Sequence, residues 1–268
     1  MKVSLFVTCL TDTFYPRAAI GLVKVLEKLG CELDFPEDQT CCGQPMWNNG
    51  FHAETRDLAE RMIEVFQDAE YVVTPSGSCA AMIREYYPEL FKDDPAMLAA
   101  AKDLASRTYE FSEFLVKVLE VDLRKHGANW PGQVTWHFSC HLRSIGMKNE
   151  TPQLLEQIEG VEYVPLPKAD QCCGFGGTFA MKYPDVSGAM ARDKAECIAS
   201  TGADFVVSND AGCTMNIAGT CRREKVDAKF IHIAELIAES LGLLDRTSPD
   251  APTPEASEPP AASAAASS

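Results

Sequence analysis

Eight of the eleven cysteines in this chain of 268 residues fall into a pattern that occurs twice. In each copy a single cysteine is followed, after 31 intervening residues, by Cys-Cys-Gly, and a last cysteine follows a Val-Val pair. The two sets are Cys9, Cys41, Cys42 and Cys79, and Cys140, Cys172, Cys173 and Cys213. Thiolates suit soft metals, so the repeat predicts metal or thiol chemistry in a chain built from two copies of one module.

Four thiolates per module match the usual ligand set of an iron–sulfur cluster. Structural zinc sites usually use short Cys-x-x-Cys pairs, and this chain has none, so zinc is the weaker interpretation. Adjacent cysteines in a regular strand would point to opposite faces. Gly43 and Gly174 let the backbone turn, so that both thiols can face one site. We therefore expect one or two iron–sulfur clusters, of the [4Fe–4S] type, bound by the eight cysteines.

Other residues near the pattern are given structural roles. The three cysteines without a counterpart are expected to fill the core: Cys31, Cys197 and Cys221. His137 is interpreted as a strand side chain, and Trp47 as packing that shields the first site. His141 could donate to a sulfur or relay a proton, although a structural role is favoured. Arg143 could bind a substrate carboxylate, but a surface or partner contact is favoured.

The surrounding elements alternate between strands and helices. The first half predicts strands at 3–7, 31–35 and 70–77 and helices at 15–29, 51–67 and 79–125, the last broken near two prolines. The second half predicts strands at 134–139, 161–166 and 204–209 and helices at 151–157, 184–200 and 230–241. This alternation predicts an α/β fold of two duplicated Rossmann-like modules with parallel sheets and a pseudo-two-fold relation. The cysteines follow strand ends, where parallel sheets build their sites.

The expected domains are a first module at 1–125, a second at 126–244 and a disordered tail at 245–268, which is rich in Pro, Ala and Ser. The net charge of −15 argues against binding to nucleic acid or to an anionic membrane. The short apolar run at the N-terminus reads as a strand, and no apolar stretch approaches the roughly 18 residues of a membrane span. We therefore expect a cytoplasmic protein. In that reducing compartment cysteines serve as metal ligands or redox thiols more often than as structural disulfides.

The duplicated pattern resembles the CCG-domain, cysteine-rich family, which includes the B subunit of heterodisulfide reductase and the iron–sulfur subunit of glycolate oxidase. The strings LFVTCLTDTFYP, CCGQPMWNNG, CCGFGGTFAMKYP and SNDAGCTMNIAG are most similar to its lactate utilisation protein A branch, over about residues 1–242. The resemblance implies an iron–sulfur electron-transfer subunit of a complex that oxidises L-lactate to pyruvate. The implied partners are an iron–sulfur subunit and a third, small subunit.

One departure from the family concerns its last ligand group, which in heterodisulfide reductase-like members is Cys-x-x-Cys. Ser76 and Asp210 stand at the first position of that pair here, so a five-cysteine cluster is not available. Four thiolates could hold an ordinary cluster, Asp210 could add an oxygen ligand, or a module could lack a cluster. Two alternative functions therefore stay open: a thiol–disulfide redox subunit and a non-enzymatic metal-binding scaffold.

Overall fold

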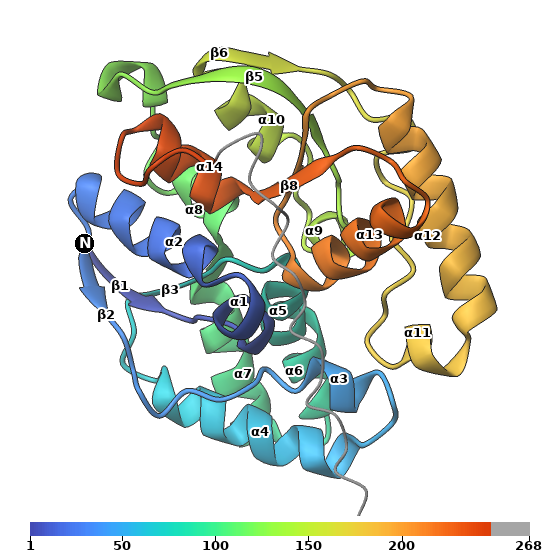
Figure 1. The fold of residues 1–268 in the computed structure, drawn as a ribbon. Coiled ribbons are helices and arrows are strands. Elements are labelled where there is room, and N and C mark those ends of the chain that lie inside the picture. The colour runs from blue at the N-terminus through green and yellow to red at the C-terminus, as the bar shows by residue number, and fades with distance from the viewer. Residues whose placement is uncertain (248–268) are drawn as a thin grey trace, which may run out of the picture.

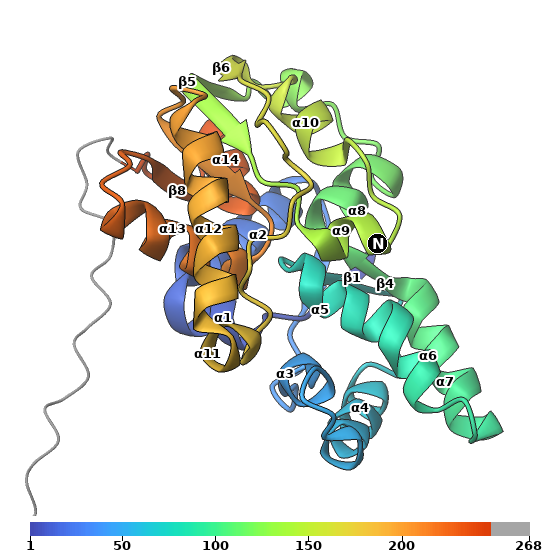
Figure 2. The ribbon, with the colours of Figure 1, turned by 90° about the vertical axis from the view of Figure 1, so that its right-hand side faces the viewer.

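The computed structural model of this chain describes residues 1–247, and its strands form two separate four-stranded sheets (Figure 1). All neighbouring strands run parallel. The strand order is β2-β1-β3-β4 in the first sheet and β6-β5-β7-β8 in the second, so the two orders correspond strand by strand. Helices connect and cover the strands (Figure 2). The predicted α/β fold of two duplicated modules is confirmed.

The first module extends from the N-terminus to the helix after β4. It consists of β1 (Lys2–Leu5), α1 (Cys9–Phe14), α2 (Pro16–Lys28), β2 (Glu32–Asp34), α3 (Gln44–Trp47), α4 (His52–Val65), β3 (Tyr71–Thr74), α5 (Gly77–Ala81), the π-helical turn η1 (Met82–Tyr86), α6 (Tyr87–Leu90), α7 (Pro95–Arg107), β4 (Thr108–Glu110) and α8 (Phe111–Lys117). The central strands β1 and β3 are buried along most of their length, as parallel strands covered by helices on both faces require.

The second module repeats this plan after a 3₁₀ turn, η2 (Leu123–His126). It consists of β5 (Asn129–Trp136), α9 (Cys140–Ser144), α10 (Glu150–Leu155), β6 (Glu159–Tyr163), α11 (Phe179–Lys182), α12 (Pro184–Ala199), β7 (Phe205–Ser208), α13 (Ala211–Arg223), β8 (Lys229–His232) and α14 (Ile233–Ser240). The central strand β7 is buried at all of its residues.

The modules contact each other through helices that occupy equivalent positions. α1 packs against α13, and its counterpart α9 packs against α5, the counterpart of α13. In the same exchanged manner α2 packs against α14, and α10 packs against α8. Reciprocal contacts of this kind are what a two-fold relation between two copies produces. The predicted pseudo-two-fold relation is therefore visible in the helix contacts.

One hydrophobic cluster extends through both modules and includes Leu22 and Leu26 of α2 together with Ile233 and Ile237 of α14. The two helices approach closely at Gly21, where a Cβ atom would lie 2.7 Å from the backbone oxygen of Ala234. Two smaller clusters surround the cysteine sites, one in each module. The shared cluster fixes the two cysteine-bearing sheets relative to each other.

Two short strands differ from the prediction. β4 lies within the segment predicted as helix 79–125, and β8 occupies the start of the segment predicted as helix 230–241, so that α14 begins only at Ile233. Both strands are short, and neither contains the Val-Val run by which the buried strands β3 and β7 are predicted. Both lie at a sheet edge and pair with one neighbour each, β4 with β3 and β8 with β7. Pairing in the folded sheet, rather than local pattern, makes them strands.

The predicted division at residue 125 stays a prediction. Of the predicted tail, residues 248–268 lie outside the described residues. Thr247 donates its backbone N–H to Glu239 Oε1 at 2.9 Å, and the Asp245 carbonyl accepts from Arg17.

Among residues 1–247, no helix combines the length and the apolar character that crossing a bilayer requires.

Candidate metal centres

The eight patterned cysteines lie where strands end, in equivalent places of the two modules. After β1 and β5, Cys9 and Cys140 are the first residues of α1 and α9. After β3 and β7, Cys79 and Cys213 lie in the first turns of α5 and α13. The Cys-Cys pairs lie on the loops that follow β2 and β6. Because the carboxyl ends of parallel strands meet at one edge of a sheet, each module gathers its four cysteines there.

The first site consists of an outer and an inner pair of thiols. Cys9 Sγ lies 3.8 Å from Cys41 Sγ, and Cys42 Sγ lies 3.3 Å from Cys79 Sγ. Cys42 and Cys79 are buried, whereas Cys9 is exposed. These distances exceed the bond length of a disulfide, about 2.05 Å. All eleven cysteines lie within residues 1–247, and each is a free thiol.

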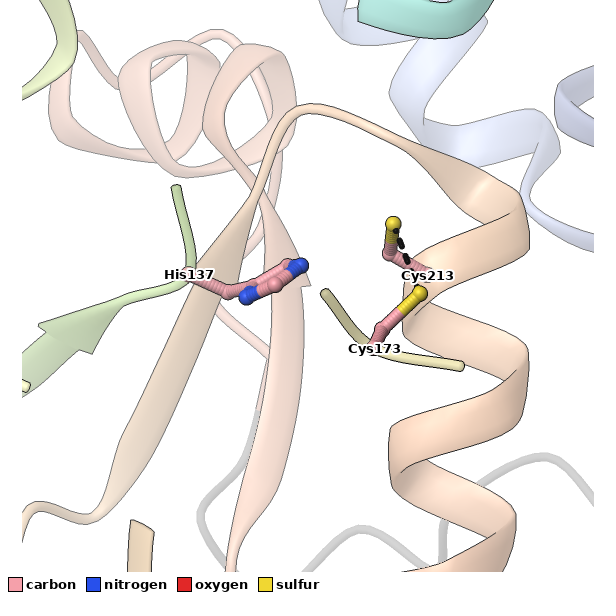
Figure 3. Close-up of side chains that lie close together, drawn as sticks. All are labelled: His137, Cys173 and Cys213. Atoms are coloured by element: carbon pink, nitrogen blue, oxygen red, sulfur yellow. Dashed lines mark hydrogen bonds between the residues drawn. The ribbon is translucent and has the colours of Figure 1, made fainter. Parts of the chain in front are cut away.

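The second site has the same arrangement. Cys173 Sγ lies 3.2 Å from Cys213 Sγ in a buried pair (Figure 3). Cys140 and Cys172 form the outer pair and are both half-buried. Backbone amides also face the sulfurs: Gly174 N–H donates to Cys172 Sγ at 3.4 Å, and Phe175 N–H donates to Cys173 Sγ at 3.5 Å. Such donors stabilise negative charge on sulfur and tune a bound metal centre.

The turn at each Cys-Cys pair depends on the glycine that follows. Gly43 and Gly174 have φ angles of +85° and +81°, in the left-handed region that other residues rarely adopt. A Cβ atom on Gly174 would also lie 2.8 Å from the backbone oxygen of Ser187. The expectation that these glycines turn the backbone is confirmed.

Proton sharing within each site concentrates negative charge on one sulfur. Hydrogen bonds from Cys42 and Cys9 lower the pKa of Cys41 to about 3, and hydrogen bonds involving Cys140 and Cys173 lower the pKa of Cys172 to about 2. The donating thiols hold their protons more tightly, so the pKa values of Cys9 and Cys140 are raised. This lowering of the pKa favours the thiolate form of one sulfur per site, which is the form that binds metals.

Ser76 and Asp210, which replace the first cysteine of a Cys-x-x-Cys pair, are helix N-caps. The Ser76 hydroxyl accepts from Cys79 N–H at 3.3 Å. Asp210 Oδ1 accepts from the amides of Gly212 and Cys213, and its Oδ2 accepts from Ser78 N–H at 2.9 Å. Both carboxylate oxygens are thus bound by donors, and the last contact joins the two modules. The side chain holds α13 and the module interface instead of presenting a free oxygen to the site.

The sequence analysis interprets His137 as an ordinary strand side chain. In the structure this polar residue lies beside the second cysteine site. It is fully buried, and one of its ring nitrogens lies within 4.8 Å of the sulfurs of Cys173 and Cys213, which lie within the same distance of each other (Figure 3). Burial lowers its pKa to about 3, and the charge of Lys194 acts in the same direction. The sequence contains a sign that His137 differs from an ordinary strand residue. The aligned strings SLFVTC and TWHFSC place Phe6 opposite His137, so the two modules differ at this position.

The neighbouring polar residues have assigned partners. His141 lies 3.7 Å from Cys140 Sγ through Nδ1, and its Nε2 lies 3.1 Å from Gln44 Nε2 of the first module. Arg143 pairs with Asp170 at 3.1 Å on the surface. Trp47 packs against the first cluster, in contact with Tyr86 and His52. His141 therefore lies between Cys140 of its own module and Gln44 of the first module, whereas Arg143 lies in a surface ion pair.

The donor set fits a thiophilic metal centre. Each site joins four thiols, and two of them are buried among apolar side chains. The pKa of one sulfur per site is lowered, and the backbone turns so that both members of the Cys-Cys pair face the site. Such sites suit iron–sulfur clusters or zinc. Hard cations such as Mg²⁺ and Ca²⁺ prefer oxygen ligands and do not match this set.

Comparison with known proteins gives two matches to the Cysteine-rich domain model, CCG, at residues 3–84 and 134–218. Lactate utilization protein A from Macrococcus caseolyticus is 50% identical over 238 residues, which cover 88% of this chain and 96% of that protein. The protein of the same name from Geobacillus thermodenitrificans is also 50% identical, and 98% of its length is covered.

Among solved structures, a hypothetical protein from Helicobacter pylori superposes with a TM-score of 0.63 at 11% identity. The match covers 90% of this chain and 49% of that chain, so this chain spans about half of its length. At this identity the likeness concerns the fold alone. The duplicated cysteine sites, the two model matches and the identity to these relatives together show that the chain belongs to the CCG cysteine-rich domain family and, within it, to the lactate utilization protein A family.

Proposed function

We propose that this chain is an iron–sulfur electron-transfer subunit of a complex that oxidises L-lactate to pyruvate. The observation that carries the proposal is the pair of four-thiol sites at equivalent strand ends of two modules. The relatives named Lactate utilization protein A support the substrate, and the thiolate chemistry supports the cofactor. In this proposal Cys9, Cys41, Cys42 and Cys79 hold the first centre, and Cys140, Cys172, Cys173 and Cys213 hold the second.

Oxidation of lactate to pyruvate releases two electrons and two protons, usually to a cofactor that accepts a hydride. The sequence has no dinucleotide-binding glycine pattern, so we assign that step to a partner subunit. A [4Fe–4S] cluster, when bound, supplies one-electron transfer. The chain's own residues would bind and insulate such a centre: the inner thiols of both sites lie among apolar side chains, and two amides of the second cysteine loop donate to sulfur.

The proposal includes a short path between the two centres, through residues next to their cysteines. Gln44, two residues after Cys42, contacts His141, the residue after Cys140, at 3.1 Å, and also donates to the Ser78 carbonyl at 3.2 Å. Helices α5 and α9, which carry Cys79 and Cys140, pack against each other. A short protein path therefore links the sites, which suits electron passage between them within one chain.

We further propose that the partners are the other subunits of this complex, one of them an iron–sulfur protein, and that the complex works in the cytoplasm. Cys9 supports this arrangement, because its side chain is exposed and could bring the first centre close to an incoming redox partner. The outer thiols of the second site are only half-buried as well.

Thiol–disulfide reduction is a second candidate, favoured by one observation. The lowered pKa of Cys41 and the close thiol pair of Cys42 and Cys79 resemble the combination of a low-pKa thiol and a resolving thiol that disulfide exchange uses. The two functions differ in cofactor. An electron-transfer subunit needs iron and sulfide, whereas exchange at these thiols alone would proceed without metal.

The test is anaerobic purification of the full chain, with measurement of iron, acid-labile sulfide and the EPR spectrum after reduction. The proposal expects about four irons and four sulfides per loaded module and a reducible signal. Zinc without labile sulfide would overturn the iron–sulfur function and favour the scaffold. Metal-free protein that reduces disulfides would favour the second candidate.

Lactate as the substrate is tested separately, in Bacillus subtilis cells that lack their own Lactate utilization protein A, which is 48% identical to this chain. The chain is expected to restore growth on L-lactate, and a Cys173→Ser variant expressed at the same level is the control that should not. Failure of the intact chain, expressed together with partner subunits from its own source organism, would contradict the assignment to lactate.

A further inference from the structure

The second site contains a polar side chain that has no hydrogen-bond partner. His137 follows β5 directly, has no exposed surface, and neither of its ring nitrogens has a hydrogen-bond partner among the described residues. Buried polar atoms in folded proteins are nearly always paired, so an unpaired imidazole requires an explanation.

The imidazole faces the two inner thiols of its module. A ring nitrogen of His137 and the sulfurs of Cys173 and Cys213 lie within 4.8 Å of one another (Figure 3). These residues come from three different segments: the end of β5, the loop after β6 and the first turn of α13. Three buried donors converging from separate segments form the kind of arrangement that can bind one metal atom.

The first module places an apolar ring at the same point. Phe6 N–H donates to the Val73 carbonyl at 2.9 Å, and His137 N–H donates to the equivalent Val207 carbonyl at 3.0 Å. The Phe6 ring packs edge-on against Phe66, in the cluster that contains Cys42 and Cys79. The fold therefore accepts a hydrocarbon ring here, and packing alone does not require the imidazole.

Other polar groups nearby are occupied. The carboxylate oxygens of Asp210 accept hydrogen bonds from the caps of α13 and α5, and the buried ammonium of Lys194 donates to the carbonyls of Lys168 and Ala169. Neither group forms a hydrogen bond with His137. The convergent neighbours of the ring are the thiols that the proposed function assigns to a metal.

We propose that His137 is a nitrogen ligand of the metal centre in the second module, so that this centre is bound by cysteine and histidine while the first is bound by cysteine alone. The inference rests on the proposed metal binding, but not on the identity of the metal. Mixed cysteine and histidine ligation occurs in both iron–sulfur and zinc sites. A neutral imidazole adds no negative charge, so the two centres would also differ in reduction potential.

The experiment uses the full chain, produced anaerobically with ¹⁵N-histidine in an otherwise ¹⁴N protein, reduced and examined by pulsed EPR. We expect strong hyperfine coupling to ¹⁵N in the wild type and its loss in His137→Phe, which copies the residue of the first module. His141→Gln is the matched control and should retain the coupling. Absence of strong ¹⁵N coupling in the wild type would overturn the proposal whether or not the variant folds, and so would coupling that persists in His137→Phe.

Metal and sulfide analysis of the same samples separates this proposal from the proposed function. Iron and sulfide without a histidine coupling would leave the iron–sulfur function standing and remove His137 from the centre. If the metal is zinc, X-ray absorption at its K-edge replaces EPR. Imidazole scattering that is lost in His137→Phe would then support His137 as a ligand, whereas the zinc itself would overturn the iron–sulfur function. Protein that binds no metal after anaerobic reconstitution would overturn both.

Discussion

At the scale of single residues, the two sites share their thiols and differ in what surrounds them. Phe6 and Met62 lie beside the first site, and His137 and Lys194 occupy the corresponding positions beside the second. The equivalence of Met62 and Lys194 follows from the helices that cover the cysteine loops, α4 and α12. Gly43 meets Thr55 and Gly174 meets Ser187, and Met62 and Lys194 each come seven residues later. A duplicated chain has thus acquired one apolar and one polar environment for the same four thiols.

Replacing one inner cysteine should remove one centre. Cys42→Ser and Cys173→Ser each delete a buried thiol of one module, so each is expected to lower bound iron to about half of the wild-type content, given four thiolates per cluster. Iron and labile sulfide analysis after anaerobic purification provides the measurement. Cys31→Ser is the control, because Cys31 lies in the shared hydrophobic cluster, and it should leave the iron content unchanged. Equal iron loss in all three variants would contradict the division of the cysteines.

Removing the charge of Lys194 should affect the second centre alone. Burial lowers the pKa of Lys194, and nearby cysteines, among them Cys173 and Cys213, act in the opposite direction. Lys194→Met removes a cation that stabilises the reduced, more negative form, so the reduction potential of the second centre should fall by about 40 mV, corresponding to roughly 1 kcal/mol.

An EPR-monitored redox titration measures that shift in each centre. Lys168→Met is the matched control, because Lys168 pairs with Asp193 on the exposed surface and its charge is screened by water. A change of equal size in the first centre, or in the control, would show that the charge of Lys194 does not act locally.

At the scale of elements, the contact between α2 and α14 depends on Gly21. A methyl group there would lie 2.7 Å from the Ala234 carbonyl oxygen, so Gly21→Ala must push two packed helices apart. We expect the free energy of unfolding to fall by about 1–3 kcal/mol, as in other overpacked cores. Gly219→Ala in α13 is the matched control, because nothing lies within 4 Å of its added Cβ, and it should raise stability by roughly 0.5–1 kcal/mol. Urea denaturation of both variants measures the difference.

Glu110, the N-cap of α8, lies at the interface between the modules and makes the stability of the fold depend on pH. Its carboxylate accepts from Ser112 N–H at 2.7 Å and from Asn209 Nδ2 of the second module at 3.0 Å, yet burial raises its pKa to about 8 from 4.5. The folded state therefore holds a proton that the unfolded state releases above pH 4.5. This contribution to stability is complete below that value and is lost as the pH rises to about 8.

Glu110→Gln should remove that pH dependence, so its stability relative to the wild type should improve by about 1 kcal/mol per pH unit between pH 5.5 and 7.5. The buried histidines His137 and His232 have lowered pKa values, so below about pH 6.5 they make the stability rise with pH. Both are present in the wild type and in the variant, so their contribution cancels in the comparison. Urea denaturation across this pH range is the measurement. Glu64→Gln, on the exposed face of α4, should run parallel to the wild type, and a parallel curve for Glu110→Gln would contradict the assignment.

The sequence predicts elements well where they are long or carry a repeated motif. The cysteine spacing predicts the duplication, and the Val-Val runs predict β3 and β7, because fully buried parallel strands read as apolar runs. The edge strands β4 and β8 escape prediction because they are defined by pairing with β3 and β7. Asp210 was a candidate ligand in the sequence, and only three-dimensional contacts show that its oxygens cap two helices.

At the scale of the whole molecule, the exchanged helix contacts lead us to expect that the two modules fold as one unit. Each module covers its partner's helices, α2 against α14 and α8 against α10, and the largest hydrophobic cluster draws residues from both. The helices that carry four of the patterned cysteines take part in the same interface, since α1 packs against α13 and α9 packs against α5. Disturbing either site therefore acts on contacts of both modules, although the ligands of each come from one.

Separate expression of the two halves tests this unity. We expect residues 1–127 and 128–247, expressed alone, to lack cooperative unfolding, because each would expose an apolar helix face that its partner module buries. Co-expressed halves should associate one to one and recover a single urea transition, since η2 is the only chain connection between the modules within residues 1–247. Circular dichroism and size-exclusion chromatography provide the measurements, with the intact chain of residues 1–247 as the reference. Cooperative unfolding of either half alone would show instead that this module is an independent domain.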